Sequence, residues 1–124
     1  MSVECAILLD VDGVLHPAEG PGQDAAGATF VTEQMRLLKE IHSSVDGGAK
    51  IVLTSNWRKY PALKRMVDKE LIGCGIEEGV HDCTDVLGTG RQMEICHWLK
   101  NYGPASFVII DDLDLTDIAT YPPG

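Results

Sequence analysis

The length of the chain, 124 residues, is enough to bury one hydrophobic core and too little for two, so we expect a single domain over residues 1–124. A composition of 44% apolar and 23% charged residues excludes wholesale disorder. The formal net charge of −9 argues against a protein that coats long nucleic acids, because phosphate backbones repel an acidic surface. The apolar runs are far shorter than a membrane span and the first residues are polar, so we expect no signal peptide, no transmembrane helix and no membrane partner.

The four cysteines show no C-x-x-C spacing and fall in or beside apolar segments, at Cys5, Cys74, Cys83 and Cys96. This pattern favours small buried residues over a zinc site or a disulfide framework. A reducing compartment, the cytoplasm, is therefore the expected location.

The first predicted element is a strand in the apolar run that begins at Cys5. A run without polar interruption is typical of a strand buried on both faces of a parallel sheet. Asp10 and Asp12 follow it, with Gly13 after them, and two carboxylates so close need a cation or a shared proton. Their hard oxygen atoms suit Mg²⁺. A lone D-x-D-G also fits a calcium loop or a plain turn, so later segments have to decide.

The middle of the chain alternates between helical and strand patterns. Residues 16–28 are rich in Gly, Pro and Ala and predict a mobile surface loop. A helix is expected from an N-cap at Thr32 to residues 46–48, and a strand at 51–53. The apolar positions that define the first helix are Leu37, Leu38, Ile41 and Val45.

A second helix is expected from Pro61, with Leu63, Met66, Val67 and Leu71 on its apolar face. It follows the most basic part of the chain, Arg58, Lys59, Lys64, Arg65 and Lys69, which reads as a solvated face or as a surface that attracts a phosphorylated substrate. Arg58 beside Trp57 predicts either a substrate contact or a guanidinium stacked on the indole.

The last third of the chain predicts a short strand at residues 80–83, a helix over 91–102 and a strand at 107–110. Strands that alternate with helices favour an α/β three-layer sandwich with a mainly parallel, Rossmann-like sheet and right-handed crossovers.

Polar residues follow three of the predicted strands: Asp10 and Asp12, then Thr54 and Ser55, then Asp111 and Asp112. The carboxyl ends of parallel strands meet at one edge of a sheet, where ligands bind. We therefore expect these groups in one crevice.

These segments resemble the haloacid dehalogenase (HAD) superfamily, most of whose members are phosphatases. Asp10-Val11-Asp12-Gly13-Val14-Leu15 is similar to its first motif, residues 51–54 to its second and Asp111-Asp112 to its fourth. Leu15-His16-Pro17, Thr54-Ser55-Asn56-Trp57-Arg58 and the helix from Arg91 are most similar to the HAD domains of Swiss-army-knife RNA-repair proteins. The resemblance implies a HAD-like fold, and no segment is long enough to form a cap domain.

The resemblance also implies roles for individual residues in a Mg²⁺-dependent phosphatase. Asp10 would be the nucleophile and Asp12 the general acid and base. Thr54, Ser55 and Asn56 would bind the phosphoryl group, together with Arg91 as the third-motif cation. The implied Mg²⁺ ligands are Asp10, Asp12, Asp111 and Asp112.

Two other functions stay open at this point: a receiver-like phospho-signalling module, and a HAD-like binding or scaffold domain without catalysis. The expected partner is a phosphorylated substrate, which can be bulky, such as a nucleic-acid end or a phosphoprotein, because no cap is evident. The chain ends soon after Asp114, where HAD relatives usually continue. Either the sequence is part of a longer chain, or the sheet has a bare edge that a partner can cover.

Overall fold

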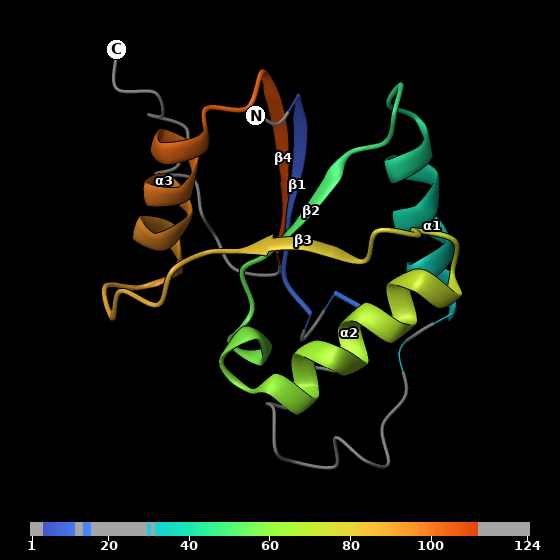
Figure 1. Ribbon diagram of the computed structural model, residues 1–124, viewed down its shortest axis with the longest axis horizontal. Helices are drawn as coiled ribbons and strands as arrows, with labels where there is room; N and C mark the ends of the chain where they lie inside the picture. Colours follow the sequence, from blue (N-terminus) through green and yellow to red (C-terminus); the bar gives the residue numbers. More distant parts are fainter. Residues whose placement is uncertain (1–3, 12–13, 16–29, 31, 112–124) are drawn as a thin grey trace.

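The fold is a four-stranded sheet with helices on both faces, seen in a computed structural model that describes residues 4–11, 14–15, 30 and 32–111 (Figure 1). The strands are β1 (Cys5–Leu9), β2 (Lys50–Leu53), β3 (Val80–Cys83) and β4 (Ser106–Ile110). They lie in the order β3-β2-β1-β4 and every pair is parallel. This confirms the predicted α/β fold, and the described residues contain no cap domain.

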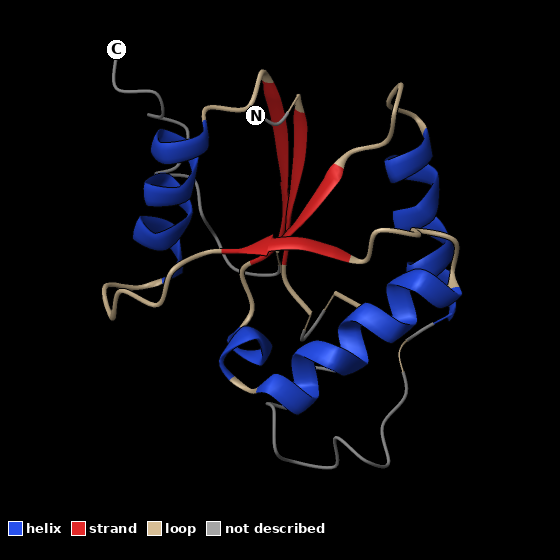
Figure 2. Cartoon of the chain, in the orientation of Figure 1, coloured by secondary structure: helices blue, strands red, loops and turns tan. Residues whose placement is uncertain are grey.

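Three α-helices cover the sheet, with α1 (Thr32–Ser43) and α2 (Pro61–Gly73) on one face and α3 (Arg91–Tyr102) on the other (Figure 2). Pro61 occupies the first turn of α2, where its missing N–H costs no hydrogen bond. Gly103 ends α3 in the left-handed conformation, and its N–H donates to the carbonyl of Leu99 at 2.8 Å. Both helix boundaries agree with those predicted from the sequence.

The strands alternate their side chains between two apolar clusters, which explains why β1 is apolar throughout. Ile7 and Leu9 face α1 and α2, whereas Ala6 and Leu8 face α3. Side chains of a strand alternate between the faces of the sheet, so a strand between two helical layers is buried on both sides.

One part of the predicted core is wrong. Leu37 and Ile41 of α1 were expected to face the core, but they are 43% and 41% exposed, and Met35 and Leu38 are the buried residues of this helix. The helix is rotated so that Leu37 and Ile41 line an open apolar groove of about 220 Å³ beside Ile110. Hydrophobic periodicity finds the helix, but burial depends on its rotation against the sheet.

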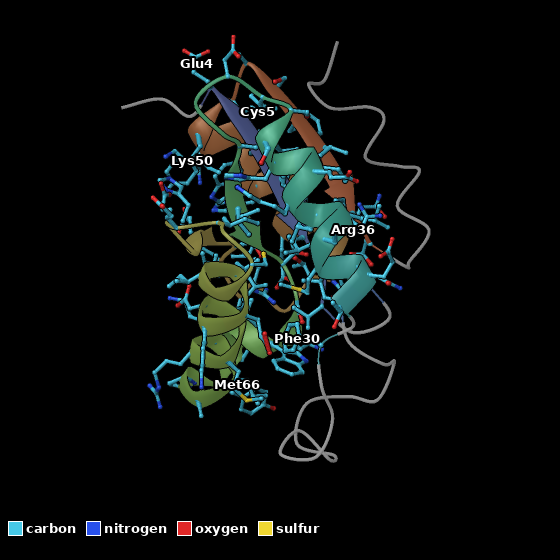
Figure 3. The ribbon with its side chains drawn as sticks, turned by 90° about the vertical axis from the view of Figure 1, so that its right-hand side faces the viewer. Glu4, Cys5, Phe30, Arg36, Lys50 and Met66 are labelled. Carbon is cyan, nitrogen blue, oxygen red and sulfur yellow. The ribbon has the colours of Figure 1, made fainter. Side chains whose placement is uncertain are left out.

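A short 3₁₀ helix, η1 (Asn56–Lys59), follows the carboxyl end of β2, and the sequence patterns did not predict it. Trp57 of η1 is fully buried and meets Phe30 edge to face at 5.7 Å between ring centroids. Figure 3 shows Phe30 at the end of the molecule opposite Glu4 and Cys5, which lie where β1 begins. The contact between Trp57 and Phe30 therefore lies at the same end of the molecule as the carboxyl ends of the strands.

The predictions about cysteines and membrane spans can be compared with the described residues, whereas those about one loop and two aspartates cannot. All four cysteines are free thiols, but each is only partly buried, and not enclosed in the core as expected. Burial raises the pKa of the Cys83 thiol above its usual value. Among the described helices, none is long and apolar enough to cross a membrane. The predicted loop at 16–28 lies outside the described residues, and so do Asp12 and Asp112.

Candidate functional site at the strand ends

The sheet ladder brings the ends of β1, β2 and β4 side by side. The backbone N–H of Asp10 donates to Ile110 O at 2.9 Å, and that of Thr54 donates to Leu9 O at 3.0 Å. These bonds continue the parallel ladder one residue beyond the strands. Asp10 therefore lies between the residues that follow its two neighbouring strands, as the position of β1 in the middle of the sheet requires.

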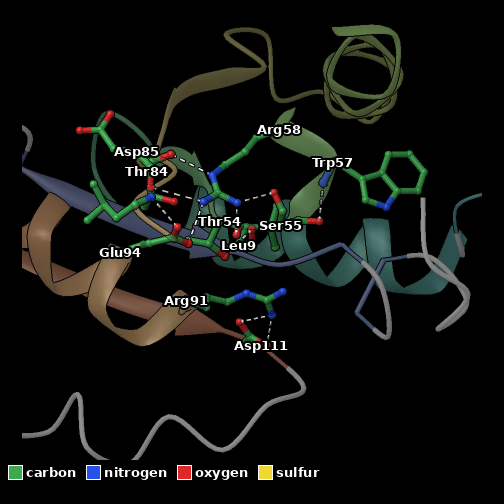
Figure 4. Close-up of polar contacts among 11 residues, drawn as sticks. Leu9, Thr54, Ser55, Trp57, Arg58, Thr84, Asp85, Arg91, Glu94 and Asp111 are labelled. Atoms are coloured by element: carbon green, nitrogen blue, oxygen red, sulfur yellow. Dashed lines mark hydrogen bonds and ion pairs between the residues drawn. The ribbon is translucent and has the colours of Figure 1, made fainter. Parts of the chain in front are cut away.

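Arg91, the first residue of α3, joins two of these strand ends, and Figure 4 shows its contact with Asp111. Its Nη1 lies 2.9 Å from both carboxylate oxygens of Asp111 and 3.3 Å from Oδ2 of Asp10. The side chains of both aspartates are 2% exposed, while that of Arg91 is 17% exposed. The two carboxylates thus converge on one cationic nitrogen, and of these three side chains Arg91 reaches solvent most.

Thr54 follows β2 at the same edge of the sheet, with its side chain directed at β1. Its Oγ1 donates to the carbonyl oxygen of Leu9 at 3.1 Å, and the residue is buried. A hydroxyl also has lone pairs and a rotatable hydrogen, so this contact leaves Thr54 able to interact with a further group. The Thr54 hydroxyl is therefore held against Leu9, the residue that precedes Asp10.

Ser55 and Asn56, the other predicted phosphate-binding residues, take different positions. Ser55 is buried, and its Oγ accepts a hydrogen bond from Trp57 N at 3.2 Å, so it caps η1. Asn56 is exposed at the start of η1. Ser55 is thus the N-cap of η1, and its hydroxyl is engaged in that cap.

The predicted metal ligands are only partly within the described residues. Asp10 and Asp111 converge, whereas Asp12 and Asp112 lie outside these residues. Within the part of the chain that the structure describes, no group of three or more His, Cys, Asp or Glu side chains gathers around a common point. The described residues therefore include two of the four predicted metal ligands, Asp10 and Asp111.

The pairing of Arg58 with Glu94 was not predicted. The expected exposed arginine is wrong, because the side chain is buried, and its burial also disfavours the predicted substrate contact. Its side chain is 2% exposed and pairs with Glu94 of α3 at 2.8 Å. One sequence signal pointed to this pair: Glu94 precedes the buried Trp98 by four residues, on the same face of α3, and a carboxylate there needs a buried partner.

The two larger cavities are elsewhere on the molecule. One of about 410 Å³ lies where β2 begins and is lined by Lys39, His42, Lys50 and neighbouring residues; burial, and then Lys39, lower the pKa of His42 there. The other, of about 420 Å³, lies between α1 and α2. Neither is lined by Asp10, Arg91 or Asp111, so strand-end chemistry, and not cavity size, identifies the candidate site.

Comparison with protein families agrees with this geometry. A family model described as the HAD domain in Swiss Army Knife RNA repair proteins matches residues 6–122. The chain belongs to this HAD family. Comparisons with curated proteins and with solved structures gave no match.

The HAD assignment confirms the resemblance inferred from the motifs around Asp10, Thr54 and Asp111. The match covers all four strands and the three helices almost entirely, and β1, which precedes Asp10, is an inner strand of the sheet. Membership supports a HAD-family, phosphatase-like function in coarse terms.

Proposed function

We propose that this protein is a Mg²⁺-dependent phosphomonoester hydrolase that acts through an aspartyl-phosphate on Asp10. The observation that carries the proposal is the convergence of Asp10 and Asp111 on Nη1 of Arg91, in a HAD-family chain. Phosphoryl transfer needs a nucleophile and positive charge around the equatorial oxygens of the phosphate. Asp10 is the proposed nucleophile, and Arg91 is the proposed source of positive charge.

The donor set fits Mg²⁺. The carboxylates of Asp10 and Asp111 supply hard oxygen atoms within reach of one nitrogen, and Asp12 and Asp112 are the proposed further ligands. When bound, Mg²⁺ would offset the negative charge that the substrate phosphate adds to these carboxylates. The cation Arg91 alone balances only part of that charge.

The chain's own residues carry the two steps. A carboxylate oxygen of Asp10 attacks phosphorus, the bond from phosphorus to the ester oxygen breaks, and Asp12 gives that oxygen a proton. Asp12 then takes a proton from water, whose oxygen attacks phosphorus and releases inorganic phosphate and free Asp10. Thr54, Arg91 and the N–H groups at Ser55 and Asn56 are proposed to hold the equatorial oxygens.

The substrate is proposed to be bulky, either a nucleic-acid end or a phosphoprotein, since the described residues contain no cap domain over the strand ends. A cytoplasmic location is proposed as well, supported by four free cysteines and the raised pKa of Cys83.

The test is the turnover of p-nitrophenyl phosphate, a 3′- or 5′-phosphorylated oligonucleotide and a phosphopeptide, with and without Mg²⁺. Asp10→Asn should lower kcat by on the order of 10³-fold or more, because it removes the nucleophile. Chelation by EDTA should abolish turnover, and added Mg²⁺ should restore it.

Asp46→Asn is the matched control, because Asp46 is exposed in the turn before β2 begins, at the edge of the sheet opposite the carboxyl ends of the strands. Its kcat should equal that of the wild type. Wild-type turnover in Asp10→Asn would remove the nucleophile assignment. Binding of Mg²⁺ without turnover of any of the three substrates would instead indicate a HAD-like binding domain.

A further inference from the structure

All three side-chain nitrogens of Arg58 donate hydrogen bonds to groups within the protein (Figure 4). Nε donates to Thr84 O at 2.8 Å, and Nη1 donates to the carbonyls of Thr54 and Ser55 at 3.0 and 2.9 Å. Nη2 donates to Glu94 Oε1 at 2.8 Å and faces Asp85 O at 3.4 Å. A guanidinium presents its donors in a rigid fork, so these contacts fix the relative positions of three chain segments.

Glu94 is committed to the same region. Its Oε1 accepts from Arg58, and its Oε2 accepts from the backbone N–H of Leu87 at 2.8 Å. The side chains of Arg58 and Glu94 are 2% and 9% exposed, so neither is placed to meet a substrate from solvent. Because both charges are buried and both are paired with close partners, their contribution is geometric.

The pair connects the two elements that carry the proposed phosphate-binding groups. Arg58 holds the backbone at Thr54 and Ser55, after β2, while Glu94 lies one turn beyond Arg91 in α3. Gly90, which precedes α3, offers no side-chain cap to the helix. The start of α3 is thus held at Glu94 by Arg58 and Leu87, and at Arg91 by the aspartates of the candidate site.

We propose that Arg58 and Glu94 are positioning residues that set the distance between the Thr54 hydroxyl and the Arg91 guanidinium. This inference rests on the proposed phosphatase function. The pair touches neither substrate nor metal, and acts through the loop after β2 and the first turn of α3. A rigid link is useful here because phosphoryl transfer depends on how the groups around phosphorus are placed.

Two conservative variants test the pair. Glu94→Gln keeps the shape but removes the charge, and Arg58→Lys keeps the charge but loses the fork, since one ammonium cannot reach three segments. With p-nitrophenyl phosphate and Mg²⁺, each should lower kcat about 10- to 100-fold, the scale of a displacement near 1 Å. KM should rise by less than the factor by which kcat falls, because the substrate contacts are displaced but retained.

Glu78→Gln is the matched control, since Glu78 forms an ion pair with Lys50 at 2.6 Å that is largely exposed. Its kcat and KM should match the wild type. Circular dichroism and thermal melts are needed for every variant, and kinetics are measured well below the lowest melting temperature. A kcat loss that disappears after correction for the folded fraction would overturn the proposal, and so would a raised KM at unchanged kcat, which marks a direct substrate contact.

The same experiment separates failure of the pair from failure of the function. Wild-type turnover with unchanged kcat in folded Glu94→Gln overturns the positioning role and leaves the phosphatase proposal intact. If the wild type turns over no ester, binding of inorganic phosphate with Mg²⁺ is measured by calorimetry. Binding that is at least about fivefold weaker in Glu94→Gln supports positioning, whereas equal binding or no wild-type binding overturns it.

Discussion

Arg91 links the two described carboxylates of the candidate site, so its removal has two separable consequences. Nη1 is within 3.3 Å of Asp10 and 2.9 Å of Asp111. Without the Arg91 guanidinium, the buried carboxylates of Asp10 and Asp111 would face each other and lose this neutralising partner. The side chain is therefore expected to matter both for the fold and for transfer of the phosphoryl group.

Arg91→Met should lower kcat by about 10²- to 10³-fold, the scale of a lost transition-state donor, whereas Arg91→Lys should retain part of the activity. The melting temperature of Arg91→Met should fall in EDTA and recover in Mg²⁺, because a bound cation replaces the missing charge. Steady-state kinetics and thermal melts give both readouts. Arg65→Met, at an exposed position of α2, is the control. Full activity in Arg91→Met would exclude Arg91 as the third-motif cation.

At the level of single residues, the sequence predicted groups whose position follows from strand order alone. Asp10, Thr54 and Asp111 each come directly after an apolar strand segment, so parallel pairing brings them together. Arg58 and Glu94 could not be found this way. Their partners are mostly backbone carbonyls and one N–H in loops after β2 and β3, and those loops are positioned only once the sheet has formed.

The secondary-structure elements were predicted well where the local signal is strong. α3 begins at Arg91 and ends at Tyr102 as expected, because glycines flank it on both sides. η1 was missed, since four residues make no periodic pattern and its cap at Ser55 shows only in the folded chain. The outward rotation of α1, with Leu37 and Ile41 exposed, depends on how the helix packs against β1 and β4.

The packing of α3 on the sheet has one polar contact that can be tested. Trp98 is buried, and its Nε1 donates to Asp82 Oδ2 of β3 at 2.8 Å. Its ring also stacks on Tyr102 at 4.9 Å between centroids. Asp82 accepts a further bond from Cys83 N at 2.8 Å, so the carboxylate is oriented by both contacts.

Trp98→Phe should destabilise the protein by about 1–3 kcal/mol, because Asp82 loses a donor in a partly buried position. Urea unfolding followed by circular dichroism measures the change in the free energy of unfolding. Tyr102→Phe keeps the stacked ring at an exposed position, and its effect should stay within about 0.5 kcal/mol. Equal stability of the two variants would mean that the indole hydrogen bond contributes nothing to the attachment of α3.

At the scale of the whole molecule, the net charge of −9 and the candidate metal site both predict that added cations stabilise the folded protein. Acidic groups repel one another in the compact state, and dissolved salt of any kind reduces that repulsion. A bound divalent cation does more, because it stabilises only the folded chain, in which Asp10 and Asp111 lie together. Screening and site binding can therefore be separated by comparing Mg²⁺ with Na⁺ at equal ionic strength.

Mg²⁺ at ten times its dissociation constant should stabilise the wild type by about 1.4 kcal/mol. For a domain of this size, that corresponds to a melting temperature raised by about 4–6 °C beyond the value in NaCl of matched ionic strength. In Asp10→Asn the excess over NaCl should disappear, because one of the two described ligands has lost its charge, while Asp46→Asn should retain it. If NaCl raises the wild-type melting temperature as much as Mg²⁺ does, screening alone accounts for the effect and the strand ends hold no divalent cation.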